Sequence, residues 1–149
     1  MKTWKQPESV LVVIHTLAGE VLLLERADRP GFWQSVTGSR EGDESLFETA
    51  RREVCEETGL LAEAPALSDW GISNTYEIYP HWRHRYAPGV THNREQVFGL
   101  QLPDRLPVRL APGEHLAWCW LPWQQAAERV FSPSNAEALR LLPSRLAPG

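Results

Sequence analysis

The chain has 149 residues, 42% of them hydrophobic, which suits one domain with a sizeable buried core. Its net charge of -4 at pH 7, with histidine counted as neutral, argues against non-specific nucleic-acid binding, because that requires a basic surface. The sequence shows no signal-peptide apolar stretch, no apolar run near the roughly 18 residues of a membrane span, and no metal-binding cysteine pattern, so we expect a cytoplasmic protein.

Two short apolar segments near the N-terminus predict a β-hairpin. Ser9–Thr16 is β-branched and nearly all apolar, as in a strand covered on both faces. A turn at 18–20 separates it from a second apolar run, Val21–Arg26. After a loop at 28–31, Phe32–Thr37 predicts a third short strand that ends at Gly38.

The segment 45–58 predicts an α-helix. Ser45 is a suitable N-cap residue, and Glu48 three positions later completes a capping box. Gly59 stands where a left-handed residue commonly ends a helix. One apolar stripe of this helix is expected to face the core: Phe47, Ala50 and Val54.

The second half of the chain predicts further strands and two helices. Strand-like segments lie at 70–79, 94–102 and 114–121, and Pro122 opens a short helix. Ser134–Leu142 predicts a last helix, followed by a frayed tail over 143–149. Strands on both sides of one strong helix predict an α/β sandwich with a mixed central sheet.

Three carboxylates share one face of the predicted helix 45–58. Glu53, Glu56 and Glu57 are spaced i, i+3 and i+4, so their like charges repel one another. A hard divalent cation would relieve this repulsion, and Mg²⁺ prefers oxygen ligands. For three glutamates alone, a solvated acidic helix face is the commoner explanation.

The surrounding residues favour the metal. Residues 38–60 fit the pattern G-x5-E-x7-R-E-U-x-E-E-x-G-U, where U is an apolar residue, at all nine fixed positions: Gly38, Glu44, Arg52, Glu53, Val54, Glu56, Glu57, Gly59 and Leu60. This pattern is the signature of the Nudix hydrolases, so the chain resembles that family. The resemblance implies one domain over 1–149, an α/β/α sandwich, and metal-dependent cleavage of a phosphoanhydride bond with Mg²⁺, or Mn²⁺ as a substitute.

The same resemblance implies roles for several of the fixed positions of the signature. Glu53 and Glu57, one turn apart, are the expected direct metal ligands, and Glu56 beside them is a further ligand or an orienting residue. Glu44 is expected to pair with Arg52 and stiffen the junction between loop and helix. Two apolar residues are expected to anchor the helix to the sheet: Val54 and Leu60.

Outside the signature, the chain resembles one branch of the family, the dihydroneopterin triphosphate pyrophosphatases, from Lys5 to about Asn135. The matching stretches are FWQSVTGS (32–39), YEIYPHWRHRYAPGVT (76–91) and EHLAWCWL (114–121). The resemblance implies removal of pyrophosphate from 7,8-dihydroneopterin 3′-triphosphate, a step in folate biosynthesis. The implied partner is a small-molecule triphosphate, with no nucleic acid or membrane, and the implied assembly is a monomer or weak homodimer.

This branch resemblance also suggests residues beyond the signature. Glu114 is implied as a third metal ligand, Lys5 and Arg26 as phosphate contacts, and Thr37 as a hydrogen-bonding partner of the ligand. Further residues are implied to contact the substrate: Tyr76, Glu77, Ile78, Tyr79, Ser134 and Asn135. Sheet packing is an equal alternative for the tyrosines, and a helix cap for Ser134 and Asn135.

The basic and aromatic cluster 81–86 is expected to neutralise the triphosphate or to orient Glu114. If this cluster is a strand, Arg83 and Arg85 share one face.

Two other functions remain as alternatives. One is a Nudix pyrophosphohydrolase that acts on canonical or oxidised nucleoside triphosphates, with the same fold and metal helix. The other is a Nudix-like module that binds a nucleotide without cleaving it. Such modules typically lose the signature carboxylates, so the intact Glu53, Glu56 and Glu57 argue against the second alternative.

Overall fold

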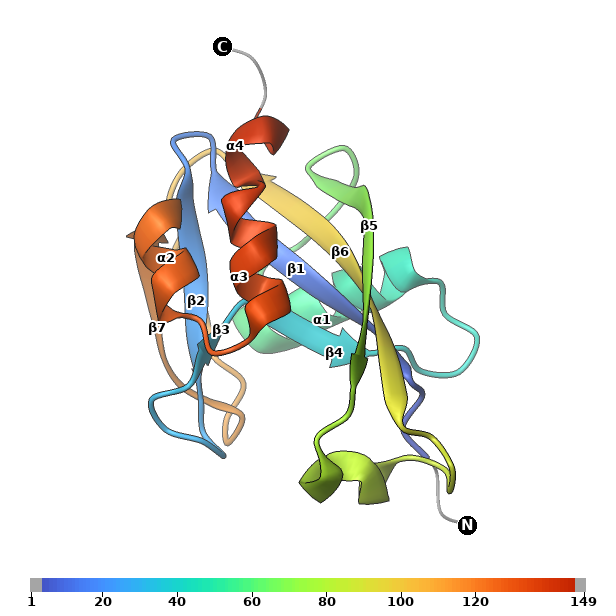
Figure 1. Cartoon of the computed structure of the whole chain (residues 1–149). Coiled ribbons are helices and arrows are strands. Elements are labelled where there is room, and N and C mark those ends of the chain that lie inside the picture. The colour runs from blue at the N-terminus through green and yellow to red at the C-terminus, as the bar shows by residue number, and fades with distance from the viewer. Residues whose placement is uncertain (1–3, 147–149) are drawn as a thin grey trace.

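A computed structural model describes residues 4–146 of the chain and contains a seven-stranded mixed sheet (Figure 1). The strand order is β3-β2-β1-β6-β5, with β4 paired to β1 and β7 paired to β2. The strands are β1 (Glu8–Thr16), β2 (Glu20–Arg26), β3 (Trp33–Gln34), β4 (Val36–Ser39), β5 (Leu67–Glu77), β6 (His92–Leu102) and β7 (His115–Pro122). The helices are α1 (Leu46–Thr58), the 3-10 helix η1 (Pro80–Arg85), α2 (Trp123–Arg129), α3 (Pro133–Arg140) and α4 (Leu142–Arg145).

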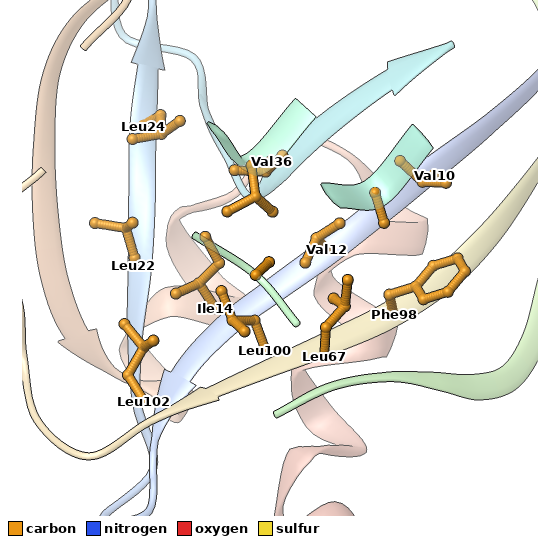
Figure 2. Packing of buried hydrophobic residues seen from close by; sticks show 13 residues of the cluster. Val10, Val12, Ile14, Leu22, Leu24, Val36, Leu67, Phe98, Leu100 and Leu102 are labelled. Atoms are coloured by element: carbon orange, nitrogen blue, oxygen red, sulfur yellow. The ribbon is translucent and has the colours of Figure 1, made fainter. Parts of the chain in front are cut away.

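Helices cover both faces of the sheet, as the predicted sandwich requires. On one face, α1 packs through Ala50 and Val54 against a cluster that includes Val12, Leu24 and Phe98 (Figure 2). On the other face, α2, α3 and α4 pack against a second cluster, and Figure 1 shows α2 and α3 in front of the sheet with α1 behind it. No helix within residues 4–146 has the length and apolar character needed to cross a membrane.

Strand β1 is the centre of the fold and has three partners. It pairs in parallel with β6 from Glu8 to Thr16, and its first half pairs antiparallel with β4. Near its end it pairs with β2 at His15 and Val21, which confirms the predicted hairpin. β4 and β2 therefore pair with different stretches of β1.

The predicted caps of α1 are confirmed. Ser45 is the N-cap, its side chain accepts from the Glu48 amide, and the Glu48 carboxylate accepts from the Ser45 amide. Gly59 ends the helix with a φ of 75°, a left-handed conformation that costs glycine little. Val54 is fully buried and Leu60 packs against the same cluster, as expected for residues that anchor α1.

The predicted strand Phe32–Thr37 is instead two short strands with different partners. Strand β3 pairs with β2, whereas β4 pairs with β1. The break falls at Ser35, whose amide donates to Asn135 Oδ1 at 2.9 Å and whose hydroxyl accepts from Asn135 Nδ2 at 3.0 Å. A side chain from α3 therefore replaces the strand partner at this position and lets the chain change neighbours.

The structure excludes the strand alternative for the cluster 81–86 and corrects the predicted frayed tail. Residues 81–85 belong to the 3-10 helix η1, which begins at Pro80 and whose Trp82 amide donates to the Tyr79 carbonyl. The tail is not frayed where it is described: α4 occupies Leu142–Arg145, and Leu142 is fully buried. Residues 147–149 lie outside the described part of the chain.

Candidate active site

A large open pocket of about 1440 Å³ lies where β4, β5, β6, η1 and the start of α3 meet the carboxylates of α1. The pocket brings together most of the residues that the sequence singled out. Those that line it are Lys5, Arg26, Thr37, Glu53, Glu57, Tyr76, Glu77, Ile78, Tyr79, Glu114, Ser134 and Asn135. Three predicted residues lie outside its lining: Glu44, Arg52 and Glu56.

Glu53 and Glu57 face each other at one end of this pocket. Their side chains are 13% and 3% exposed. Burial, followed by the hydrogen bond to Glu53, raises the pKa of Glu57 well above its usual range. Burial also raises the pKa of Glu53. The Thr37 backbone amide donates to Glu57, which ties the pair to β4.

The carboxyl pair suits a divalent cation. Glu57 Oε1 is buried and has no hydrogen-bond partner within the described residues. Burying carboxylates this closely is costly unless a positive charge compensates them, and Mg²⁺ takes one or two carboxylates with water and phosphate oxygens. Gly38 leaves the space for this pair, because a Cβ at that position would overlap the Glu53 carboxyl group.

Arg52 joins the loop to α1 as the signature implies. It donates to both carboxylate oxygens of Glu44, at 2.7 and 3.1 Å, and to the Ser39 carbonyl at 2.9 Å. These contacts hold the pKa of Glu44 at about 2, chiefly through the Arg52 hydrogen bonds. Arg52 also donates to Glu53 Oε1 at 2.7 Å, so the same guanidinium orients a carboxylate of the pocket.

The other two predicted metal ligands, Glu56 and Glu114, lie in different surroundings. Glu56 is 54% exposed and accepts from Arg52 at 3.2 Å, away from the pocket. Glu114 precedes β7 and lies close enough to Glu57 for its negative charge to raise the pKa of Glu57 further. Among residues 4–146, no three carboxylate, imidazole or thiol side chains stand close enough to form a complete metal site.

Three cationic side chains converge near the carboxyl pair. Removal from bulk water, followed by the charges of Arg85 and Arg26, lowers the pKa of Lys5, whereas Glu53 opposes this change. The guanidinium groups of Arg26 and Arg85 both lie against the Trp82 ring, at 5.2 and 5.9 Å from its centroid. The cluster 81–86 thus brings positive charge to the pocket through η1, while Arg83 points elsewhere and pairs with Glu77 at 3.4 Å.

The implied substrate contacts fall into two groups. Tyr76 and Tyr79 line the pocket and are 41% and 49% exposed, so neither is core packing. Asn135 is 1% exposed and its amide is occupied by Ser35. Neither Ser134 nor Asn135 is the cap of α3, because the N-cap is Ser132 and the helix begins at Pro133.

The sequence reasoning missed several polar residues of the pocket. The side chain of His115 is 5% exposed and its Nε2 lies 3.7 Å from Glu57 Oε1, and burial lowers the pKa of the imidazole. Asn93 and Glu95 lie on β6 and are also buried. The sequence carries one signal for them: Asn93 and Glu95 alternate with Val97 along β6, so they continue a face of the strand that turns apolar further along.

The fold and this site together define a Nudix protein. The sequence matches the NUDIX domain family over residues 5–142, and the chain belongs to that family. It is 44% identical over 144 residues to the dihydroneopterin triphosphate diphosphatase of Haemophilus influenzae, covering 94% of this chain and 89% of that protein. The enzyme of the same name from Escherichia coli is 45% identical over 141 residues, 93% of each chain. The solved structure of the E. coli dihydroneopterin triphosphate pyrophosphohydrolase aligns with a TM-score of 0.85 at 44% identity, over 93% of this chain and 96% of that one.

Proposed function

We propose that this chain is a dihydroneopterin triphosphate diphosphatase, which hydrolyses 7,8-dihydroneopterin 3′-triphosphate to the monophosphate and pyrophosphate in the cytoplasm. The main observation behind the proposal is that one pocket holds two groups of opposite charge. A buried carboxyl pair, Glu53 and Glu57, lies beside three cations: Lys5, Arg26 and Arg85. Relatives of this name align with the chain over nearly its whole length, which supports the pterin substrate.

Each part of the site has a task in this reaction. Glu53 and Glu57 would hold the cation, together with Glu114, which precedes β7 and lies near Glu57. A divalent cation such as Mg²⁺ or Mn²⁺, held there, would supply positive charge for the phosphate oxygens and activation of the attacking water. Lys5 and Arg26 bind the outer phosphates, and they stabilise the negative charge of the departing pyrophosphate.

The remaining groups position these reacting parts. Arg52 keeps α1 in register with the loop through Glu44 and orients Glu53 directly. The Thr37 hydroxyl donates to the Val10 carbonyl at 2.9 Å, which leaves its oxygen free to accept from a ligand. Trp82 supports Arg26 from the η1 side of the pocket.

A substrate panel tests the proposal. Release of phosphate is followed with added inorganic pyrophosphatase and Mg²⁺, and dihydroneopterin triphosphate is compared with the four common nucleoside triphosphates and an oxidised one. We expect kcat/KM for the pterin to exceed the others by at least about tenfold, the range in which a few pocket contacts discriminate. Glu57→Gln serves as the control for contaminating phosphatases. Preference for a nucleoside triphosphate would overturn the substrate assignment.

A further inference from the structure

A polar patch lies on the sheet wall of the pocket, formed by three strands that run side by side: β1, β6 and β5 (Figure 1). Glu95 on β6 stands between Ser9 of β1 and Asn74 of β5, and Asn93 stands opposite Tyr76. Because these residues alternate along their strands or face one another across them, their side chains share one face of the sheet. All five line the pocket.

Glu95 is a buried carboxylate with spare capacity to accept hydrogen bonds. It is 4% exposed, and its Oε1 accepts from the Ser134 hydroxyl at 3.0 Å. Among the described residues, Asn74 also forms a side-chain hydrogen bond with Glu95, and both Ser134 and Asn74 are neutral. An ionised carboxylate offers about four acceptor positions, and burial without a cation is unfavourable unless N–H donors fill them. Burial accordingly raises the pKa of Glu95.

Asn93 adds a second acceptor beside Glu95. Its Nδ2 donates to the Ser9 hydroxyl at 2.7 Å and to the Tyr76 hydroxyl at 3.1 Å, which uses both N–H groups and sets the direction of the amide. The Oδ1 atom is buried and has no partner within residues 4–146. Buried polar atoms are nearly always hydrogen-bonded, so this wall of the pocket calls for a ligand that carries several N–H donors.

We propose that Glu95, with Asn93 beside it, binds the 2-amino-4-oxopyrimidine edge of the substrate ring and thereby sets the selectivity of the enzyme. That edge presents the exocyclic amino group and the ring N3–H side by side, which matches the two oxygens of one carboxylate. Adenine presents no such adjacent pair of donors. The inference rests on the proposed function, because it assigns the ring of the pterin substrate to this patch.

The spacing of the strands is consistent with this assignment. Thr37, whose amide is bonded to Glu57, stands opposite Leu11 on β1, and Ser9 on the same face of β1 stands opposite Glu95. The patch therefore lies two strand spacings from β4, about 10 Å. A fused bicyclic ring with a three-carbon side chain extends over a similar distance, so the triphosphate reaches the α1 carboxyl groups when the ring lies against Glu95.

A purely structural role for Glu95 would be to fasten α3 to the sheet through Ser134. Glu95→Gln separates the two roles, because glutamine keeps one oxygen for the Ser134 hydroxyl but replaces the other by an NH₂ group that opposes the ring N–H. Removal of a buried charge should leave Tm unchanged or raise it. Ala138→Gly is the matched control, since it loosens α3 at a buried position outside the pocket lining and leaves the carboxylate in place.

The test compares wild type, Glu95→Gln and Ala138→Gly by steady-state kinetics on dihydroneopterin triphosphate, with inorganic tripolyphosphate as a competitive inhibitor. We expect Glu95→Gln to raise KM at least about tenfold, the scale for one lost charge-assisted hydrogen bond. The inhibition constant of tripolyphosphate should stay unchanged, because it lacks the ring. A KM within twofold of wild type, or an equal loss of tripolyphosphate affinity, would overturn the assignment of Glu95.

Failure of the proposed function would look different. If the wild-type enzyme does not cleave dihydroneopterin triphosphate, the pterin proposal falls, and the role of Glu95 is then decided by the ratio of kcat/KM for GTP and ATP. Guanine carries the same 2-amino-4-oxo edge. A preference for GTP that Glu95→Gln abolishes and Ala138→Gly retains supports the recognition role, whereas equal use of both nucleotides by wild type overturns it.

Discussion

The ion pair between Glu44 and Arg52 should stabilise the fold in a pH-dependent way. It holds the pKa of Glu44 at about 2 instead of 4.5, which corresponds to roughly 3 kcal/mol of preference for the ionised form. Solvent screening at this junction reduces the contribution to about 1–2 kcal/mol. Because the folded-state pKa is depressed, the contribution is present above pH 4.5 and is lost as the pH falls towards 2. Glu44→Gln should therefore lower Tm at pH 7 by about 2–8 °C.

Urea and thermal unfolding of wild type and Glu44→Gln at pH 7 and pH 3 measure this contribution. The difference in the free energy of unfolding should shrink by about half or more at pH 3. Glu63→Gln is the matched control: Glu63 pairs with Arg51 of the same helix but is 65% exposed, so its loss should cost less than about 0.5 kcal/mol. Equal stability of Glu44→Gln and wild type at pH 7, or an equal deficit at both pH values, would refute the reasoning.

Three further predictions concern turnover. Glu57→Gln should lower kcat at least about 10²-fold at saturating Mg²⁺. Glu56→Gln should have a much smaller effect, because the Glu56 carboxylate is 54% exposed and outside the pocket. Near wild-type turnover of Glu57→Gln would contradict the metal assignment. Glu114→Gln should shift a Mg²⁺ titration of activity to higher concentration or reduce its plateau, and an unchanged curve would leave Glu114 a solvated loop residue. Gly38→Ala places a methyl group on the Glu53 carboxyl, so kcat should fall at least about tenfold with the circular dichroism spectrum retained; unchanged turnover would disprove this close approach.

The parts of the site that depend on local spacing were predictable from the sequence. Residues adjacent in the sequence determine both caps of helix α1, and Glu53 and Glu57 must share a face once the helix forms. The pairing of Glu44 with Arg52 followed from the family pattern and is confirmed by two hydrogen bonds. The same spacing also suggested Glu56, but Glu56 precedes Glu57 by one residue, which turns its side chain by about 100° around the helix, and it is exposed to solvent.

The parts that depend on distant contacts were not predictable from local pattern. The change of partner at Ser35 is caused by Asn135, 100 residues away, so Phe32–Thr37 read as one strand. The 3-10 helix Pro80–Arg85 carries arginines at alternating positions, a spacing that also fits a strand, and its helical form follows from Pro80 at its first position. The link between Glu95 and α3 is likewise non-local, which is why a polar residue in β6 could not be given a role from the sequence.

Phosphorus NMR of the products tests the central claim most directly. Purified enzyme is incubated with 7,8-dihydroneopterin 3′-triphosphate and Mg²⁺, and the spectrum is followed from the earliest turnover without added pyrophosphatase. The proposed function predicts that the three triphosphate signals are replaced together by those of pyrophosphate and dihydroneopterin monophosphate, and that Glu57→Gln leaves the triphosphate intact. Appearance of inorganic phosphate and a diphosphate as the first products, or a triphosphate spectrum that stays unchanged with the wild-type enzyme, would contradict it.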